Sequence, residues 1–226
     1  MKKNDWMTDF YGVDWFEITS IDEINPGVEN ALIEWRVSAQ NPDSINKAES
    51  NGFKLVESAI EFESQVTPDI SKDTSEIELA KEEHLDQIID ITQKCFLDNN
   101  DLYTRFKNKE FFTGEQCRSY YEASIKNNFS KQSTVTVVSQ DEEGISAYYM
   151  IRKVDENIYK GVMTGVLPRA RGKRLHAKMQ QASFNAIGKT ITVINSTQLS
   201  NFNTIKSHIR ANRILSKIDH IFYLRV

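Results

Sequence analysis

The order of hydrophobic segments after residue 132 limits this chain to a small number of folds. Segments of alternating hydrophobicity, rich in β-branched residues, come first and are joined by tight polar turns. Helical patterns then alternate with further strand patterns. The predicted elements are strands over residues 133–140, 144–154 and 157–166, a helix over 174–187, a strand over 190–195, a helix over 200–214 and a strand over 220–226. Few folds continue an antiparallel meander in this way, so we predict a mixed α/β (α+β) fold.

The part of the chain before this meander is also predicted to mix helices and strands. A polar link at residues 65–75 with one proline is the strongest candidate for a domain boundary. We therefore expect an N-terminal α/β half-domain over residues 1–75 and a second domain over 76–226. The predicted elements are strands over 12–21, 53–64 and 77–80, helices over 30–40, 81–96 and 115–129, and a long loop or broken helix over 97–114.

Charge is unevenly distributed along the 226 residues, although the formal net charge is only -4. Residues 1–80 hold 6 Lys and Arg against 17 Asp and Glu, whereas residues 157–218 hold 11 Lys and Arg and no acidic residue. This asymmetry favours an anionic partner for the C-terminal part over a basic but merely solvated surface.

Several classes of protein are not favoured by the sequence. No apolar run approaches the roughly 18 residues that a membrane span needs, so no membrane span is expected. The N-terminus has lysines but no apolar stretch behind them, which is not the pattern of a secretory signal. Cys95 and Cys117 lack the spacing and histidine partners of a zinc site, so we expect no metal and two thiols in a reducing cytoplasm.

The stretch from Val162 to Met179 is the strongest candidate for a binding site. The predicted strand stops at Pro168, which cannot continue a ladder, and a helix is expected to follow. A helix start exposes unpaired N–H groups and the positive end of the dipole, which together form an anion site. Five cations surround this point: Arg169, Arg171, Lys173, Arg174 and Lys178.

The spacing of Val166, Pro168, Arg171, Gly172 and Lys173 resembles the coenzyme A loop of the GCN5-related N-acetyltransferase superfamily. The order of elements from residue 158 to the C-terminus is similar to that fold as well. The resemblance implies that backbone amides hold the pyrophosphate and that the preceding strand binds the pantetheine arm of acetyl-CoA or a longer acyl-CoA. The cofactor-binding residues that it implies are Thr164, Val166, Arg171, Gly172, Lys173, Arg174, Leu175, His176 and Asn201.

Two positions depart from the superfamily pattern. Glycine is expected at 174 and glycine or alanine at 176, but the chain has Arg174 and His176. Either these side chains point outward and help to bind phosphate, or the close approach of phosphate is impaired and coenzyme affinity is poor. His176 could also be a helix residue with no role in binding.

Residues 200–213 resemble the superfamily helix beside the thioester. Asn201 matches its asparagine, and His208 stands where the family has a tyrosine that protonates the departing thiolate. A histidine can donate this proton near neutral pH, so His208 is the predicted catalytic residue, the alternative being a lining role without proton transfer. Asn212 replaces a glycine and can adopt the same left-handed conformation. The strand over 157–166 carries no Asp or Glu, so the general base stays unassigned.

The N-terminal part resembles N-acyltransferases of the dTDP-fucosamine acetyltransferase type. Residues 6–12 are similar to their W-D-x-x-F-F-G opening, residues 48–56 to their next segment, and residues 95–106 to their F-x-x-x-R-[FY] loop. The resemblance implies a nucleotide-linked (dTDP) amino-deoxysugar as acceptor and a role in surface polysaccharide, such as lipopolysaccharide, biosynthesis. The substrate-binding residues predicted on this basis are Phe10, Tyr11, Tyr103, Arg105 and Phe106.

Other functions remain open on the sequence. The acceptor could be a different amine, or the chain could bind acyl-coenzyme A without catalysis. Nucleic-acid binding is not expected, because the acid-free stretch lacks the interleaved aromatic residues of a single-strand platform. A sheet edge could pair into a homodimer. The position of the sugar amine (C3 or C4) and the length of the acyl chain are not determined.

Overall fold

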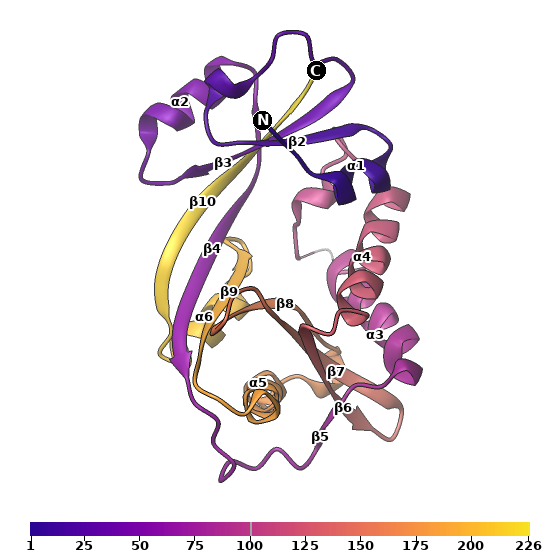
Figure 1. Cartoon of the computed structure of the whole chain (residues 1–226). Helices are drawn as coiled ribbons and strands as arrows, with labels where there is room; N and C mark the ends of the chain where they lie inside the picture. The colour runs from indigo at the N-terminus through magenta and orange to yellow at the C-terminus, as the bar shows by residue number, and fades with distance from the viewer. Residues whose placement is uncertain (100) are drawn as a thin grey trace. The chain divides into compact units, whose positions relative to one another are not determined.

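The computed structural model describes residues 1–99 and 101–226, and it divides into two compact units (Figure 1). The first unit comprises Met1–Glu61, Thr104–Gln116 and Ser196–Val226, and the second comprises Phe62–Tyr103 and Cys117–Asn195. Strands β4 (Lys54–Val66) and β9 (Ile191–Gln198) run from one unit into the other. The boundary expected between residues 75 and 76 divides the chain into two domains that are continuous in sequence, whereas each compact unit combines several segments. This boundary stays a prediction.

The first unit is built on a sheet with helices around it. Its strands are hydrogen-bonded in the order β1-β2-β3-β10-β4, with β2 parallel to β3 and β3 antiparallel to β10. The strands predicted over 12–21, 53–64 and 220–226 and the helix over 200–214 are confirmed. The elements are β1 (Lys2–Lys3), α1 (Asp5–Tyr11), β2 (Asp14–Ile18), a 3-10 turn (Ile21–Glu23), β3 (Ala31–Ser38), α2 (Pro42–Ser50), a 3-10 turn (Arg105–Lys107), α6 (Phe202–Arg210) and β10 (Ile214–Arg225).

The helix predicted over residues 30–40 is wrong. This segment forms strand β3, which lies between β2 and β10 in the sheet. Seven of its eight residues are buried or nearly so, and only Arg36 is exposed. A strand covered on both faces loses the alternation of polar and apolar residues that identifies a half-buried strand. The apolar run therefore matched helical spacing by chance.

Helices α1 and α2 were not predicted as helices, although each begins with a local signal. The side chain of Asn4 accepts a hydrogen bond from the N–H of Met7, and that of Asn41 accepts one from Ser44. Pro42 occupies the first position of α2, where its missing N–H costs nothing. Both helices are short, so their apolar spacing repeats too few times to stand out.

The second unit is a sheet with helices on both faces. Its strands follow the order β9-β8-β7-β6-β5, antiparallel except for the pair β8–β9. Nearly all of the elements predicted between residues 77 and 195 are confirmed; Asn100, in the expected loop over 97–114, lies outside the described residues. The elements are β5 (Ile77–Leu79), a 3-10 turn (Glu82–His84), α3 (Leu85–Thr92) continued by a π-helical turn (Gln93–Leu97), α4 (Gly114–Phe129), β6 (Thr134–Asp141), β7 (Gly144–Lys153), β8 (Ile158–Val166), a 3-10 turn (Pro168–Ala170) and α5 (Leu175–Ile187).

Two apolar layers hold the second unit together. Helix α5 packs one face of the sheet with Leu175, Met179 and Phe184. Helices α3 and α4 pack the opposite face through residues such as Ile88 and Ile125. Figure 1 shows α5 on one side of β6–β8 and α3 and α4 on the other. This packing fixes the end of β8 and the start of α5, where the predicted site lies. Among the described helices, none is long and apolar enough to cross a bilayer.

Candidate coenzyme site and its neighbours

The loop between β8 and α5 contains two residues with left-handed backbones. Gly172 has φ 84° and Arg174 has φ 58°. A Cβ at Gly172 would meet no atom within 4 Å, so glycine is favoured there by conformation rather than by space. Arg174 stands at one of the two positions where the superfamily pattern has glycine. An arginine in this conformation costs about 1 kcal/mol, which indicates that surrounding structure imposes the turn.

Helix α5 begins at Leu175 without a side-chain cap. Arg174 is the N-cap residue, and its side chain makes no hydrogen bond to the helix start. Leu175 is buried in the core beneath α5 and anchors the first turn. His176 lies beside it with its ring edge-on to Tyr149, at 5.8 Å between ring centroids. The helix start therefore presents N–H groups and a positive dipole end without a side-chain acceptor.

The five cations of this region fall into two groups. Arg169 forms an ion pair with Asp141, at 3.0 Å between Nε and Oδ2, and Lys178 pairs with Glu76. In the described part of the chain, no carboxylate lies within ion-pair distance of the remaining three, which are exposed: Arg171, Lys173 and Arg174. Uncompensated positive charge at the positive end of a helix is unfavourable unless an anion binds there.

The end of β8 next to this loop has an irregular edge. Pairing with β7 shifts between Met163 and Gly161, so that Val162 is an extra, bulged residue. Pairing with β9 ends at Gly161 and Asn195, whereas β8 continues to Val166. Within this unit, no strand therefore pairs with the last five residues of β8 on the side away from β7. Such an edge can accept an extended ligand by β-type hydrogen bonds.

The side chains around the end of β8 are already engaged. The hydroxyl of Thr164 donates to the carbonyl of Tyr148 at 2.8 Å, and Nε of Arg171 donates to the carbonyl of Val166 at 3.2 Å. The Cys95 thiol also points to the Val166 carbonyl, at 3.6 Å. Burial raises the pKa of Cys95, so the sulfur stays a thiol near neutral pH and is a poor nucleophile.

Asn201 and His208 belong to the first unit. Asn201 is the N-cap of α6, and its side chain accepts from the N–H of Thr204 at 3.3 Å. His208 lies in the last turn of α6 and is 2% exposed. Nη1 of Arg213 lies 3.1 Å from Nδ1 of His208. Because arginine only donates, Nδ1 must accept, and the proton of a neutral ring is on Nε2. Asn212 has φ 53°, which confirms the left-handed conformation expected where the family has glycine.

Arg105, predicted to contact substrate, lies in a buried network of charges. Its Nη1 is 3.3 Å from Oε1 of Glu34, its backbone N–H donates to Oε2 of Glu57 at 3.0 Å, and its side chain is 13% exposed. The guanidinium also lies over the ring of Phe106 at 4.9 Å. Burial acts to raise the pKa of Glu34, but the charges of Arg105 and Arg36 outweigh it and lower that pKa. Burial dominates at Glu57 and raises its pKa.

The other predicted substrate residues divide between the units. Tyr103 is 41% exposed and belongs to the second unit. In the first unit, Phe10 packs edge-on against Tyr11 at 4.7 Å between centroids, and Phe112 contacts both Tyr11, at 4.9 Å, and Phe106, at 5.7 Å. The structure thus brings three of the five predicted aromatic and arginine positions into one aromatic cluster.

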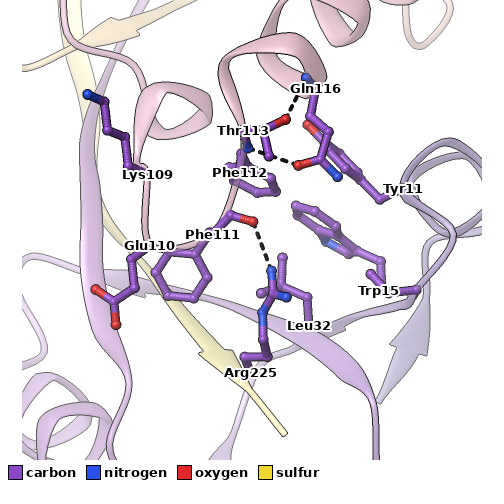
Figure 2. Close-up of a pocket in the computed structure, with 11 residues that line it drawn as sticks. Tyr11, Trp15, Leu32, Lys109, Glu110, Phe111, Phe112, Thr113, Gln116 and Arg225 are labelled. Atoms are coloured by element: carbon purple, nitrogen blue, oxygen red, sulfur yellow. Dashed lines mark hydrogen bonds between the residues drawn. The ribbon is translucent and has the colours of Figure 1, made fainter.

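A pocket of about 250 Å³ opens beside this aromatic cluster (Figure 2). Two lining residues, Trp15 and Phe112, stack with an interplanar angle of 10°, and Arg225 donates to the carbonyl of Phe111 at 2.8 Å. Apart from Tyr11, its residues were not predicted as site residues; the only local signal was the aromatic character of the stretch before Gly114. The pocket is lined by Tyr11, Val13, Trp15, Leu32, Lys109, Glu110, Phe111, Phe112, Thr113, Gln116 and Arg225.

Comparison with known proteins assigns the fold. No protein-family profile matches the chain, and no curated protein matches it. A solved structure of a functionally unknown conserved protein from Staphylococcus epidermidis is 9% identical, with a TM-score of 0.61 over 86% of this chain and 72% of that one. A GCN5-related N-acetyltransferase from Sphaerobacter thermophilus is 12% identical, with a TM-score of 0.56 over 88% of this chain and 61% of that one. A tandem GNAT protein from the clavulanic acid biosynthesis pathway is 10% identical, with a TM-score of 0.54 over 85% and 63%.

These likenesses show that the chain has the fold of GCN5-related N-acetyltransferases, as the order of elements predicted. The chain spans less than two thirds of the length of the two acetyltransferase-fold proteins named above. Among the described residues, no cluster of three or more His, Cys, Asp or Glu side chains could hold a metal ion.

Proposed function

We propose that this protein transfers an acyl group from acyl-coenzyme A to an amine. The observation that carries the proposal is the start of α5, where three cations surround an uncapped helix end and no carboxylate of the described residues lies within ion-pair distance of them. Coenzyme A brings three phosphates to such a place, and its pyrophosphate fits the N–H groups of a helix start. The proposed cofactor-binding residues are Thr164, Val166, Arg171, Gly172, Lys173, Arg174, Leu175, His176 and Asn201.

The unpaired edge of β8 supports the same proposal. A pantetheine arm carries amides that can pair with a strand edge in β-fashion, and the edge after Gly161 is open on one side within its unit. A backbone N–H between Thr164 and Val166 would then stabilise the oxyanion that forms on the thioester carbonyl. Binding both reactants side by side supplies much of the rate acceleration.

The proposed reaction is a direct attack of the acceptor amine on the thioester carbonyl. A C–N bond forms, the C–S bond breaks, and the amine loses one proton while the thiolate gains one. His208 is the proposed donor to the thiolate. In the contact with Arg213, Nδ1 accepts and the ring is neutral, so its Nε2–H can only donate a hydrogen bond to the thiolate. To transfer a proton, the ring must first leave Arg213 and take up a proton at Nδ1; the imidazolium then gives its Nε2 proton to the thiolate and returns to the neutral form. Water, or an amine that binds already neutral, would take the place of a protein base.

We propose a nucleotide-linked amino sugar, with dTDP as the nucleotide, as the acceptor. The similarity of residues 6–12 and 95–106 to enzymes of the dTDP-fucosamine acetyltransferase type supports this class. A nucleotide diphosphate-sugar would also bring two further phosphates, and these need cations to bind them. Phe10, Tyr11, Tyr103, Arg105 and Phe106 are the proposed sugar-nucleotide contacts, because rings can stack on a base or sugar. Surface polysaccharide synthesis is the corresponding role.

Binding is tested first by calorimetry with acetyl-coenzyme A and, in parallel, with a single-stranded RNA of similar charge. We expect binding of the coenzyme at micromolar concentration and a matching rise in the unfolding temperature, with no specific binding of the RNA. Binding of RNA alone, with a steep salt dependence, would overturn the acyl-transfer proposal in favour of a nucleic-acid module.

Catalysis is tested by following thiol release from acetyl-coenzyme A and a longer acyl-coenzyme A. The panel contains dTDP sugars with the amine on C3 or C4, a polyamine and a lysine peptide. Release with a dTDP amino sugar supports the proposed acceptor; release only with another amine keeps the reaction and removes the sugar. The second candidate function, a non-catalytic acyl-coenzyme A binder, rests on the missing glycines at Arg174 and His176, and it predicts binding without release.

The role of His208 is tested with His208→Gln. Glutamine keeps hydrogen-bonding capacity but cannot protonate a thiolate, so thiol release should slow by about 100-fold while coenzyme affinity stays nearly unchanged. Arg213→Lys is the matched control, because it alters the same buried pair but retains a donor to Nδ1 of His208. Unchanged turnover in His208→Gln would reduce the histidine to a lining residue.

A further inference from the structure

Asn195, at the point where β8 and β9 stop pairing, has an amide nitrogen without a hydrogen-bond partner in the described structure. Its side chain is buried, with only 5% of the residue exposed. The hydroxyl of Tyr149 lies 3.3 Å from Oδ1, so the carbonyl end of the amide has a partner. In the described structure, Nδ2 has none, although it carries two N–H donors. Buried amides without partners are rare because they have lost their hydrogen bonds to water.

The neighbours of Asn195 on its own face of β9 are apolar. Ile191 and Val193, which share its face of β9, are fully buried in the core beneath α5. Gly161 is the paired residue on β8. A Cβ at Gly161 would lie 2.4 Å from Oδ1 of Asn195, so only glycine leaves room for the amide there. A core that needed packing alone would have a larger residue at 161 and an apolar one at 195.

The polar group at Asn195 connects to the start of α5. Tyr149, whose hydroxyl contacts Oδ1, also packs against the ring of His176 in the first turn of the helix. Asn195, Tyr149 and His176 therefore form a continuous row of polar-tipped side chains within one unit. This row runs from the fork between the strands to the loop with Arg171, Lys173 and Arg174.

We propose that Nδ2 of Asn195 donates a hydrogen bond to a carbonyl of the acyl-pantetheine arm where that arm lies along the open edge of β8. This inference rests on the proposed function and adds a positioning residue to it. The ligand group must be a hydrogen-bond acceptor, because the amide nitrogen only donates. The arm of coenzyme A offers two amide carbonyls and the thioester carbonyl. Adenosine 3′,5′-diphosphate, which has two of the three phosphates of coenzyme A but lacks the arm, offers none in this place.

The test compares acetyl-coenzyme A with adenosine 3′,5′-diphosphate as calorimetric ligands. Asn195→Leu removes the donor with little change in size, and Thr192→Val on the same strand is the control. We expect about tenfold weaker binding of acetyl-coenzyme A to Asn195→Leu, unchanged binding of the diphosphate, and no effect of Thr192→Val on either. Equal loss for both ligands, or no loss, would overturn the proposal.

A second measurement does not depend on a substituted core. In the ¹⁵N-labelled native protein, the side-chain NH₂ resonances of Asn195, assigned from their disappearance in Asn195→Asp, should shift on adding acetyl-coenzyme A but not the diphosphate. If the native protein binds acetyl-coenzyme A and these resonances do not move, the amide is satisfied by water and only this inference falls. If the native protein does not bind acetyl-coenzyme A at all, the proposed function fails and takes the inference with it.

Discussion

Two sets of arginine and lysine residues in this chain have opposite electrostatic environments. Arg171, Lys173 and Arg174 are exposed at the start of α5, with no carboxylate within ion-pair distance in the described part of the chain. Arg105 is nearly buried and lies against Glu34 and Glu57. The first set is available to an external anion, because its charge is not neutralised by the protein. The charge of Arg105 is already neutralised from inside.

This difference separates two roles that a sequence cannot distinguish. A cation that binds a phosphate must keep its charge available, and this weakens the fold slightly when no ligand is bound. A cation that stabilises a buried carboxylate contributes to folding and gives up most of its attraction for ligands. Arg105 remains a proposed substrate contact, and its pairing with Glu34 means that a phosphate would have to compete with a buried carboxylate.

The largest expected effect is on the buried network, through Glu34→Gln. The substitution removes the carboxylate that the Arg105 guanidinium contacts, and the free energy of unfolding at pH 7 should fall by about 3 kcal/mol. Glu34 has a lowered pKa in the folded protein, so its contribution is present above the unfolded value near 4.5 and is lost as pH falls through the folded value. Urea unfolding at pH 7 and at pH 3.5 measures this, and the difference between the variant and the native protein should be smaller at the lower pH.

Glu29→Gln is the control for Glu34→Gln, because Glu29 is exposed in the same unit. It should change stability by less than about 0.5 kcal/mol. An equally small effect of Glu34→Gln would mean that the Glu34–Arg105 pair contributes nothing, and the contrast between the two sets of cations would disappear.

The second effect concerns the exposed cations. Replacing Arg171, Lys173 and Arg174 together by alanine should weaken coenzyme A binding about 30-fold, equivalent to about 2 kcal/mol after allowance for solvent screening. Calorimetry at two salt concentrations checks this, since the native affinity should fall with salt more steeply than that of the variant. Arg169→Ala is the matched control, because Arg169 is paired with Asp141. If the triple variant and Arg169→Ala lose affinity equally, then pairing with a carboxylate does not decide which cations bind the coenzyme.

Local signals explain why the β8–α5 region could be predicted. Three local features lie within 20 residues of one another: a strand that ends at a proline, a glycine in a left-handed turn and an apolar helix face. The structure contains all three. The same holds for Asn212, whose left-handed backbone was expected from its position after a helix.

Long-range contacts explain what could not be predicted. Glu34 and Arg105 are 71 positions apart, so nothing local in the sequence indicates that they pair. The pocket of Figure 2 combines residues from three separate segments of the first unit. Strand β3 was mistaken for a helix because its burial on both faces depends on β10, near the other end of the chain. The orphan amide of Asn195 depends in the same way on Gly161, which is distant in sequence but adjacent in the sheet.

A third, smaller effect sharpens the description of the buried network through Glu57→Gln. The pKa of Glu57 is raised by burial, so the folded protein holds its proton to higher pH than the unfolded chain. Between the unfolded value near 4.5 and the raised folded value, the stability of the native protein therefore falls as pH rises. Glutamine is uncharged and still accepts from the N–H of Arg105, so the variant should lose less stability than the native protein as pH rises from 4.5 to 7.5. A loss of stability at pH 7.5 would mean that Arg105 outweighs burial at this carboxylate.

The smallest effect compares Arg174→Gly with Arg174→Ala. Both remove the cation, so both should weaken coenzyme binding to a similar degree, about threefold. They differ in conformation: alanine at φ 58° retains the steric strain of the left-handed backbone, whereas glycine relieves it at the cost of a more flexible unfolded chain. Arg174→Gly should therefore be more stable than Arg174→Ala by about 0.5–1 kcal/mol in urea unfolding. Asn212→Gly against Asn212→Ala repeats the comparison at the end of α6, where no ligand charge is at stake. A stability difference at 212 but none at 174 would mean that the loop before α5 relaxes when its arginine is lost, and that Arg174 itself holds the left-handed turn in place.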